Sequence, residues 1–68
     1  MLTEVKEYIC DTAPTDDDLR IAMSFAQAYH CIIKITWVMK WSGRYSVLVN
    51  KEDSLEDIQS RLPKLYGM

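Results

Sequence analysis

The stretch KITWVMKWSGRYSVLV, residues 34–49, decides the fold that the sequence predicts. On both sides of Ser42-Gly43, β-branched, aliphatic and aromatic side chains recur at alternate positions, which is typical of strands. Both tryptophans and three of the eight basic residues of the chain lie in this stretch. We therefore expect an antiparallel β-hairpin that carries a basic, aromatic surface.

The turn determines which residues of the hairpin face each other. A two-residue loop at Ser42-Gly43 places Trp41 opposite Arg44 and mixes apolar with polar side chains on each face. A three-residue loop over 41–43, with Gly43 left-handed in a G1 bulge, keeps one face apolar. This register pairs Met39 with Tyr45, Trp37 with Val47, and Ile35 with Val49. The opposite face is expected to be exposed and to carry Lys34, Thr36, Val38, Lys40, Arg44, Ser46, Leu48 and Asn50.

The segment TDDDLRIAMSFAQAYH, residues 15–30, predicts the longest helix. Thr15 is a suitable N-cap whose hydroxyl can accept from the backbone N–H of Asp18. The aspartates at 16–18 lie in the first turn, where negative charge suits the helix dipole, so helix initiation explains them better than metal binding does. The expected buried stripe comprises Leu19, Ala22, Met23, Ala26 and Tyr29, widened by Ile21 and Phe25.

The sequence DSLED predicts a second helix near the C-terminus. Asp53 or Ser54 can cap it, with Glu56 or Asp57 as the residue that hydrogen-bonds back to the cap. Its apolar stripe is expected to comprise Leu55, Ile58 and Leu62, and Pro63 ends it.

The N-terminal segment fits two structures. Leu2, Val5 and Ile9 have the i, i+3, i+7 spacing of an amphipathic helix that begins at Thr3, while residues 3–10 also suit a third strand. Taking the helix, the predicted fold is a small single α+β domain in the order α-α-β-β-α. Its helices would pack on one face of the antiparallel hairpin. The strand over 3–10 remains the alternative, and it would relieve the marginal stability of a two-stranded sheet.

Charge is distributed unevenly along the chain, whose net charge is −2. Residues 31–51 contain four basic residues and no acidic one, whereas the rest contains four basic and ten acidic residues. The sequence has no apolar run long enough for a membrane span and no signal peptide at its N-terminus, so we expect a cytoplasmic protein. Cys10 and Cys31 are expected to be reduced and buried rather than joined in a disulfide.

Candidate catalytic and metal-binding groups are few. A dyad of His30 and Cys31 would need converging side chains, and neighbouring residues at a junction between helix and strand tend to point apart. A zinc site would have only Cys10, His30 and Cys31, without the usual pair spacing. With two glycines in the chain, no phosphate-binding loop is expected. We therefore expect a non-enzymatic protein without a cofactor.

The hairpin is the best candidate binding surface. Trp41 lies at the turn beside Lys40 and Arg44, a combination that suits an acidic protein surface or single-stranded nucleic acid. The predicted binding residues are Lys34, Lys40, Trp41, Arg44 and Lys51. In the alternative interpretation this face is simply solvated, its lysines keep the sheet edge from pairing with other chains, and Trp41 folds over the core.

Three segments, WVMKWSGRY, SLEDI and LPKLYG, resemble a pattern in small uncharacterised proteins of phages and conjugative elements of gut Firmicutes. The resemblance spans strand, turn, strand, helix and the C-terminal ending. It implies a cytoplasmic accessory protein of a mobile element and brings no assigned activity. We expect a protein-interaction or regulatory module that binds a protein or itself through the hairpin edge. The alternative is a nucleic-acid-binding accessory protein that uses the basic hairpin face.

Overall fold

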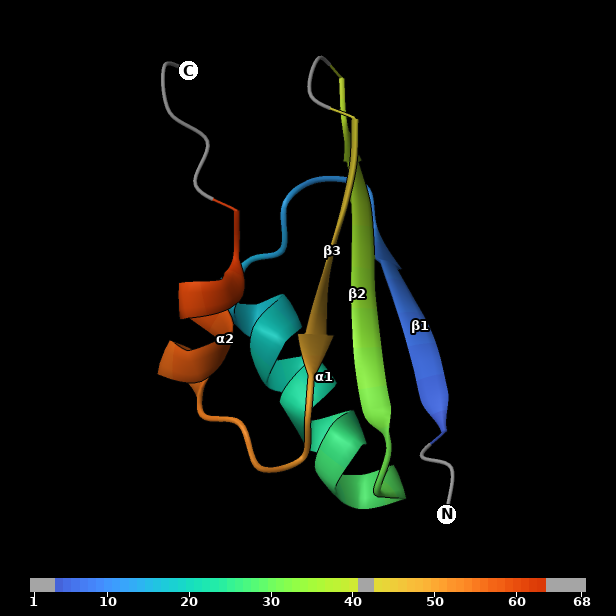
Figure 1. Cartoon of the computed structure of the whole chain (residues 1–68), viewed down its shortest axis with the longest axis vertical. Coiled ribbons are helices and arrows are strands. Elements are labelled where there is room, and N and C mark those ends of the chain that lie inside the picture. Colours follow the sequence, from blue (N-terminus) through green and yellow to red (C-terminus); the bar gives the residue numbers. More distant parts are fainter. Residues whose placement is uncertain (1–3, 41–42, 64–68) are drawn as a thin grey trace.

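The computed structural model describes residues 4–40 and 43–63, which form a three-stranded mixed sheet and two helices (Figure 1). In chain order the elements are β1 Val5–Cys10, α1 Asp16–Tyr29, β2 Ile32–Met39, β3 Gly43–Val49 and α2 Leu55–Arg61. The strands lie in the order β1-β2-β3, with β1 parallel to β2 and β2 antiparallel to β3. Both helices pack on the same face of the sheet (Figure 1).

The predicted α+β class is confirmed, but the predicted order is wrong, because the chain begins with a strand. The alternative, a strand within residues 3–10, is the one that the structure adopts. Each residue of β1 pairs with a residue of β2, from Val5 with Ile32 to Cys10 with Trp37. This long-range pairing decides between two local patterns that suit the segment almost equally well. It also converts a marginal two-stranded hairpin into a three-stranded sheet.

The predicted faces of the hairpin are largely correct, but its register is wrong. Met39 pairs with Gly43, Trp37 with Tyr45, and Ile35 with Val47. This register differs from the predicted one by two residues, so every side chain stays on its expected face. Gly43 has a φ of 91°, as expected for a left-handed position, but it pairs within β3 rather than forming the predicted bulge. Residues 41 and 42 of the predicted loop lie outside the described residues.

The core lies between the helices and the inner face of the sheet. Its buried residues are Leu19, Ala22, Ala26, Cys31, Ile33, Ile35, Trp37, Val47, Val49 and Ile58. Ala22 and Ala26 have no exposed surface, and their small side chains let the α1 backbone approach the sheet closely. The prediction that α1 buries a wide stripe is therefore only partly correct. Ile21, Phe25 and Tyr29 are exposed, because a three-stranded sheet covers only the central part of the stripe.

Both helix starts follow the capping chemistry that the sequence predicts. The Thr15 hydroxyl accepts from the Asp18 N–H, and the Asp18 carboxylate accepts from the Thr15 N–H at 2.9 Å. In α2 the capping residue is Ser54 rather than Asp53, and Asp57 hydrogen-bonds back to it at 3.0 Å. Neither helix of the described chain has the length and apolar character needed to cross a bilayer.

Candidate functional site

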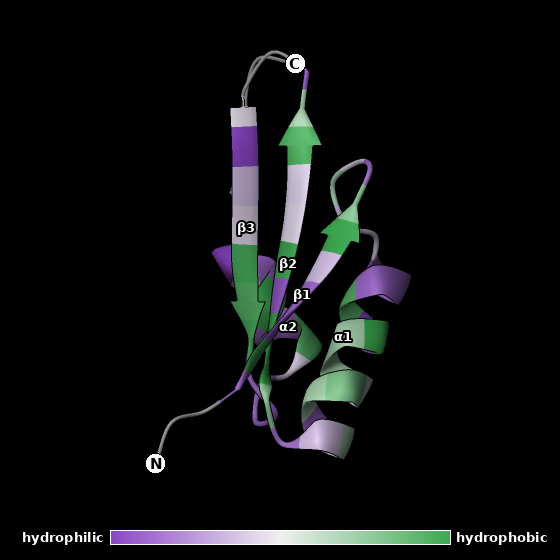
Figure 2. Cartoon of the chain, turned by 90° about the vertical axis from the view of Figure 1, so that its right-hand side faces the viewer, coloured by the Kyte–Doolittle hydropathy of each residue, from purple (hydrophilic) through white to green (hydrophobic). Residues whose placement is uncertain are grey.

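Neither of the two described helices packs against one face of the sheet, and we call this face the open face. Its side chains alternate along the strands with those of the core. Figure 2 shows that the strands carry both hydrophobic and hydrophilic residues, and that the second half of β3 is hydrophobic. Four large aliphatic residues on it are exposed: Val5 by 54%, Ile9 by 70%, Val38 by 60% and Leu48 by 47%. The other members of the open face within the paired strands are Glu7, Ile32, Lys34, Thr36, Arg44 and Ser46.

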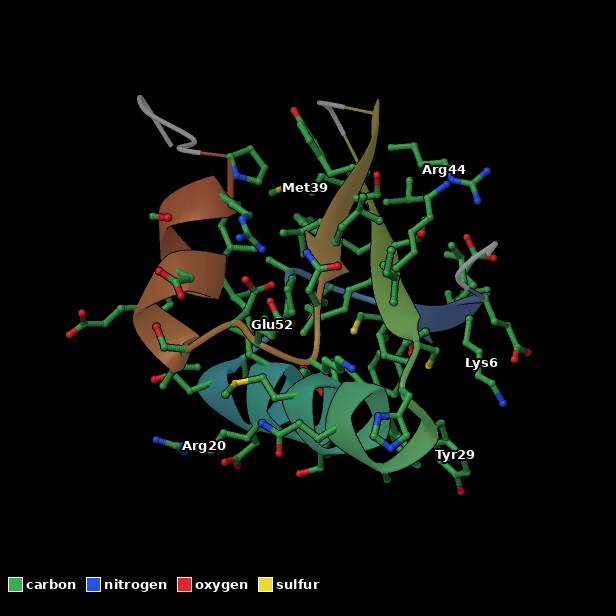
Figure 3. The ribbon with its side chains drawn as sticks, turned by 60° about the horizontal axis from the view of Figure 1, so that its bottom comes forward. Lys6, Arg20, Tyr29, Met39, Arg44 and Glu52 are labelled. Carbon is green, nitrogen blue, oxygen red and sulfur yellow. The ribbon has the colours of Figure 1, made fainter. Side chains whose placement is uncertain are left out.

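A polar network crosses all three strands on the open face. The Thr36 hydroxyl donates to Glu7 Oε2 at 2.9 Å, and Arg44 Nη2 lies 3.6 Å from the same oxygen. Glu7 and Arg44 thus meet above Thr36, which explains why Thr36 is only 3% exposed on a face without a covering helix. Arg44 points away from both helices in Figure 3. The network places a hydrogen-bonded carboxylate among the basic residues of the hairpin.

The sequence predicts a basic surface on the hairpin, but the open face also carries the acidic residue Glu7. The hairpin segment has no acidic residue in its own sequence, but β1 brings Glu7 beside Lys34, its partner in the parallel register. Sequence reasoning missed this carboxylate because it treated residues 3–10 primarily as a helix. The alternation in VKEYIC was the signal for the strand, and within it Val5, Glu7 and Ile9 share one face.

The four predicted binding residues that the structure describes do not form one cluster. Lys34 and Arg44 lie on the open face, where Lys34 is half-buried and Arg44 is exposed. Lys40 follows β2 at the hairpin turn, whereas Lys51 lies in the loop after β3, at the other end of the sheet. Trp41 lies outside the described residues, so both interpretations of its position, exposed at the turn or folded over the core, stay predictions. The predicted burial of Trp37 is confirmed, since its side chain is 2% exposed.

His30 and Cys31 lie between α1 and β2 and differ in burial. His30 caps the C-terminus of α1 in a left-handed conformation with a φ of 50° and is exposed. Cys31 is buried in the core, Cys10 is half-buried, and neither forms a disulfide. Within residues 4–40 and 43–63, no three potential metal ligands from His, Cys, Asp and Glu gather in one place.

An ion pair fastens α2 to the edge of the sheet. Arg61 of α2 makes a bidentate contact with Asp53, in which Nη2 donates to Oδ1 at 2.8 Å. The Asp53 carboxylate also accepts from the Asn50 N–H at 2.7 Å, and Arg61 donates to the Leu48 carbonyl at 3.1 Å. Hydrogen bonds from Arg61 and Asn50 outweigh desolvation and hold the pKa of Asp53 below its usual value. The Leu48 carbonyl, at the hairpin edge that the sequence suggested as a binding surface, thus already has a hydrogen-bond donor within the chain.

This ion pair should make the free energy of unfolding depend on pH. The pKa of Asp53 is lower in the folded chain than in the unfolded chain, so the unfolded chain takes up protons first as pH falls. The resulting stabilisation is full above the unfolded pKa, about 4, and is lost as pH falls through the folded pKa. At neutral pH, we expect Asp53→Asn to lower the free energy of unfolding by about 1–2 kcal/mol. Urea unfolding at neutral pH and at about pH 3 measures both effects.

Asp17→Asn is the matched control for this prediction. Asp17 also faces an arginine, Arg20, but its side chain is 87% exposed and the pair is 3.5 Å apart. Such a surface pair contributes little, so the control should change stability by less than about 0.5 kcal/mol. Equal losses for Asp53→Asn and Asp17→Asn would show that the Arg61 contact does not hold α2 in place.

Comparison with protein-family models, with curated proteins and with solved structures found no match to this chain.

Proposed function

We propose that this chain is a non-enzymatic protein-interaction module that pairs with a second copy of itself through the open face. The observation that supports this most is the set of four exposed aliphatic side chains, Val5, Ile9, Val38 and Leu48, around the network of Glu7, Thr36 and Arg44. Burial of exposed apolar surface is the main driving force for association. A regulatory role in the cytoplasm, as part of a mobile element, is the context that the sequence resemblance suggests.

A second copy suits the open face because that face carries both signs of charge. In a twofold-symmetric pair, each copy presents the same surface to the other. A face with basic residues alone would repel itself, whereas Glu7 lies among Lys34 and Arg44 and supplies the opposite charge. Face-to-face packing of two sheets, each backed by its helices, is a common way to cover such surfaces.

The open face is a better candidate than the hairpin edge that the sequence suggested. β3 is an edge strand, but Arg61 already donates to its Leu48 carbonyl. Side chains that cover strand edges prevent pairing with other chains. The proposal therefore keeps self-association and moves it from the edge of the hairpin to the open face.

The proposal is tested by substitution of Val38, the most exposed aliphatic residue of β2. Sedimentation velocity of the wild-type chain over a range of concentrations should give a dimer. Val38→Lys should shift it to a monomer by adding an unmatched charge to each buried face. Ile21→Lys is the control, because Ile21 is an exposed aliphatic residue on α1, away from the open face. A wild-type chain that stays monomeric, or a dimer weakened equally by both lysine variants, would contradict the proposal.

The alternative, nucleic-acid binding by Lys34, Lys40, Arg44 and Lys51, has less support. Single-strand binding usually combines cations with aromatic side chains on which bases stack. The aromatic residues of the described strands, Tyr8, Trp37 and Tyr45, pack with the core on the opposite side of the sheet. Titration of a labelled single-stranded oligonucleotide distinguishes the two functions. Binding through four basic contacts should weaken steeply with salt, with a log–log slope of roughly −3.

A further inference from the structure

We propose a second interaction site, distinct from the open face, at the unpaired edge of β1. The site accepts an extended peptide segment of another protein as a fourth strand of the sheet. One apolar side chain of that segment occupies the groove between β1 and α1, and basic side chains of the segment lie along the acidic outer edge. This mode of recognition combines main-chain hydrogen bonds with a side-chain pocket.

The backbone of β1 presents donors and acceptors on its outer edge. The Glu4 carbonyl accepts from the Ile32 N–H at 2.9 Å, so the even-numbered residues of this segment direct their backbone groups toward β2. Because these groups alternate in direction along a strand, those of Val5, Glu7 and Ile9 point outward. β1 is an edge strand. In the described chain, the outward-pointing N–H and C=O groups of these three residues have no backbone hydrogen-bond partner.

A groove of about 290 Å³ runs beside this edge, between β1 and α1. Phe25 and Tyr29 form its outer wall, with stacked rings whose centroids lie 5.9 Å apart. Both residues are substantially exposed, by 43% and 58%. The remaining lining residues are Lys6, Glu7, Tyr8 and Ile33. An apolar side chain in this groove would cover aromatic surface that is now in contact with solvent.

The two ends of the groove are marked by polar contacts between β1 and α1. At one end Lys6 Nζ lies 4.8 Å from the centre of the Tyr29 ring, and Figure 3 shows both residues on the same side of the molecule. At the other end the Tyr8 hydroxyl donates to Asp18 Oδ1 at 3.3 Å. The site is preformed, because its walls consist of the stacked Phe25 and Tyr29 rings and these two contacts. A preformed site loses less conformational entropy on binding.

Charge favours a foreign basic segment over a second copy of β1. If two β1 strands paired antiparallel through the outward backbone groups of Val5, Glu7 and Ile9, the two Glu7 side chains would lie directly opposite each other. Like charges in that position destabilise the pairing. Residues 4–11 carry three acidic residues and one basic residue. Glu4 lies 4.0 Å from Lys6 and Glu7 lies 3.6 Å from Arg44, but both pairs are exposed and thus weak, so a segment with lysine or arginine at its outward positions is still complementary.

Selection from a phage-displayed library of random linear peptides tests this site. The enriched peptides should alternate apolar with basic or polar residues. Phe25→Ala should weaken their binding at least about tenfold, because Phe25 forms a wall of the groove. Ile9→Pro should weaken it similarly, because proline removes an outward N–H without breaking the pairing with β2. Ile21→Ala is the control on α1, and it should bind as the wild type does.

Amide hydrogen exchange of the chain with a selected peptide provides a second, independent readout. Binding should slow exchange at Val5, Glu7 and Ile9, whose N–H groups would gain partners. The Val38→Lys variant should bind the peptide normally, so failure of the open-face dimer and failure of this site are distinguishable. The inference is overturned if no peptide is enriched, if Phe25→Ala and Ile9→Pro bind as well as Ile21→Ala, or if the β1 amides gain no protection.

Discussion

Replacing Trp37 with alanine should lower the free energy of unfolding by about 3–5 kcal/mol. The side chain is 2% exposed and ranks first in volume among the fully buried residues of the described chain. A chain of 68 residues has a total stability of roughly 3–10 kcal/mol. We therefore expect Trp37→Ala to be marginally folded or unfolded at room temperature. Urea unfolding followed by far-ultraviolet circular dichroism measures the decrease in the free energy of unfolding. A variant that lacks the native circular-dichroism signal even without urea would also meet this prediction.

Trp37→Phe separates the volume of the side chain from its polar atom. The indole Nε1 is buried and has no hydrogen-bond partner among the described residues, which carries a desolvation penalty of about 1–3 kcal/mol. Phenylalanine removes that penalty and keeps a ring beside Tyr45, whose ring centroid now lies 5.9 Å from that of Trp37. The loss for Trp37→Phe should thus be much smaller than that for Trp37→Ala.

Val38→Ala serves as the control for both Trp37 variants. Val38 is the next residue of β2, but it points to the open face and is 60% exposed. At a protein concentration at which the chain is monomeric, so that the proposed open-face pairing does not contribute, its truncation should change stability by no more than about 0.5–1 kcal/mol. If Trp37→Ala costs no more than Val38→Ala, the core does not depend on the indole, and the assignment of the two faces of β2 is wrong.

The sequence predicted best the features that depend on near neighbours. The cap of α1 follows from Thr15 and Asp18, which are three residues apart and satisfy each other. The faces of β2 and β3 follow from period two, because a shift of two residues leaves each side chain on the same face. The register itself depends on the turn, for which the sequence favoured a three-residue loop over 41–43, whereas Met39 pairs with Gly43. A local pattern therefore gave the inner and outer faces but not the pairing partners.

The candidate sites depend on contacts between segments that lie far apart in the chain, and they could be predicted only in part. Lys34 and Arg44 were recognised as surface residues, but Glu7 meets Arg44 only because β1 pairs with β2. The groove beside β1 was missed for a different reason. Phe25 and Tyr29 have the spacing of core residues, and their exposure follows from the limited width of a three-stranded sheet.

Replacing Ile58 with alanine should lower the free energy of unfolding by about 2–5 kcal/mol. Ile58 is the fully buried residue of α2, a helix of seven residues that is too short to be stable alone in water. Its side chain joins α2 to the core, and the polar contacts from α2, such as Gln59 to Asp16 at 2.9 Å, are exposed. Loss of the Ile58 contacts should therefore release the helix before the sheet unfolds.

Amide hydrogen exchange and a double substitution distinguish release of α2 from a uniform loss of stability. In Ile58→Ala the amides of α2 should exchange fast while those of β2 keep partial protection, whereas Gln59→Ala should leave both nearly unchanged. Because Arg61 contacts Asp53 only while α2 is docked, Asp53→Asn should destabilise the Ile58→Ala chain less than it destabilises the wild type. Full additivity of the two losses would mean that the side chain of Ile58 and the ion pair of Arg61 act independently, and that α2 does not move as one unit.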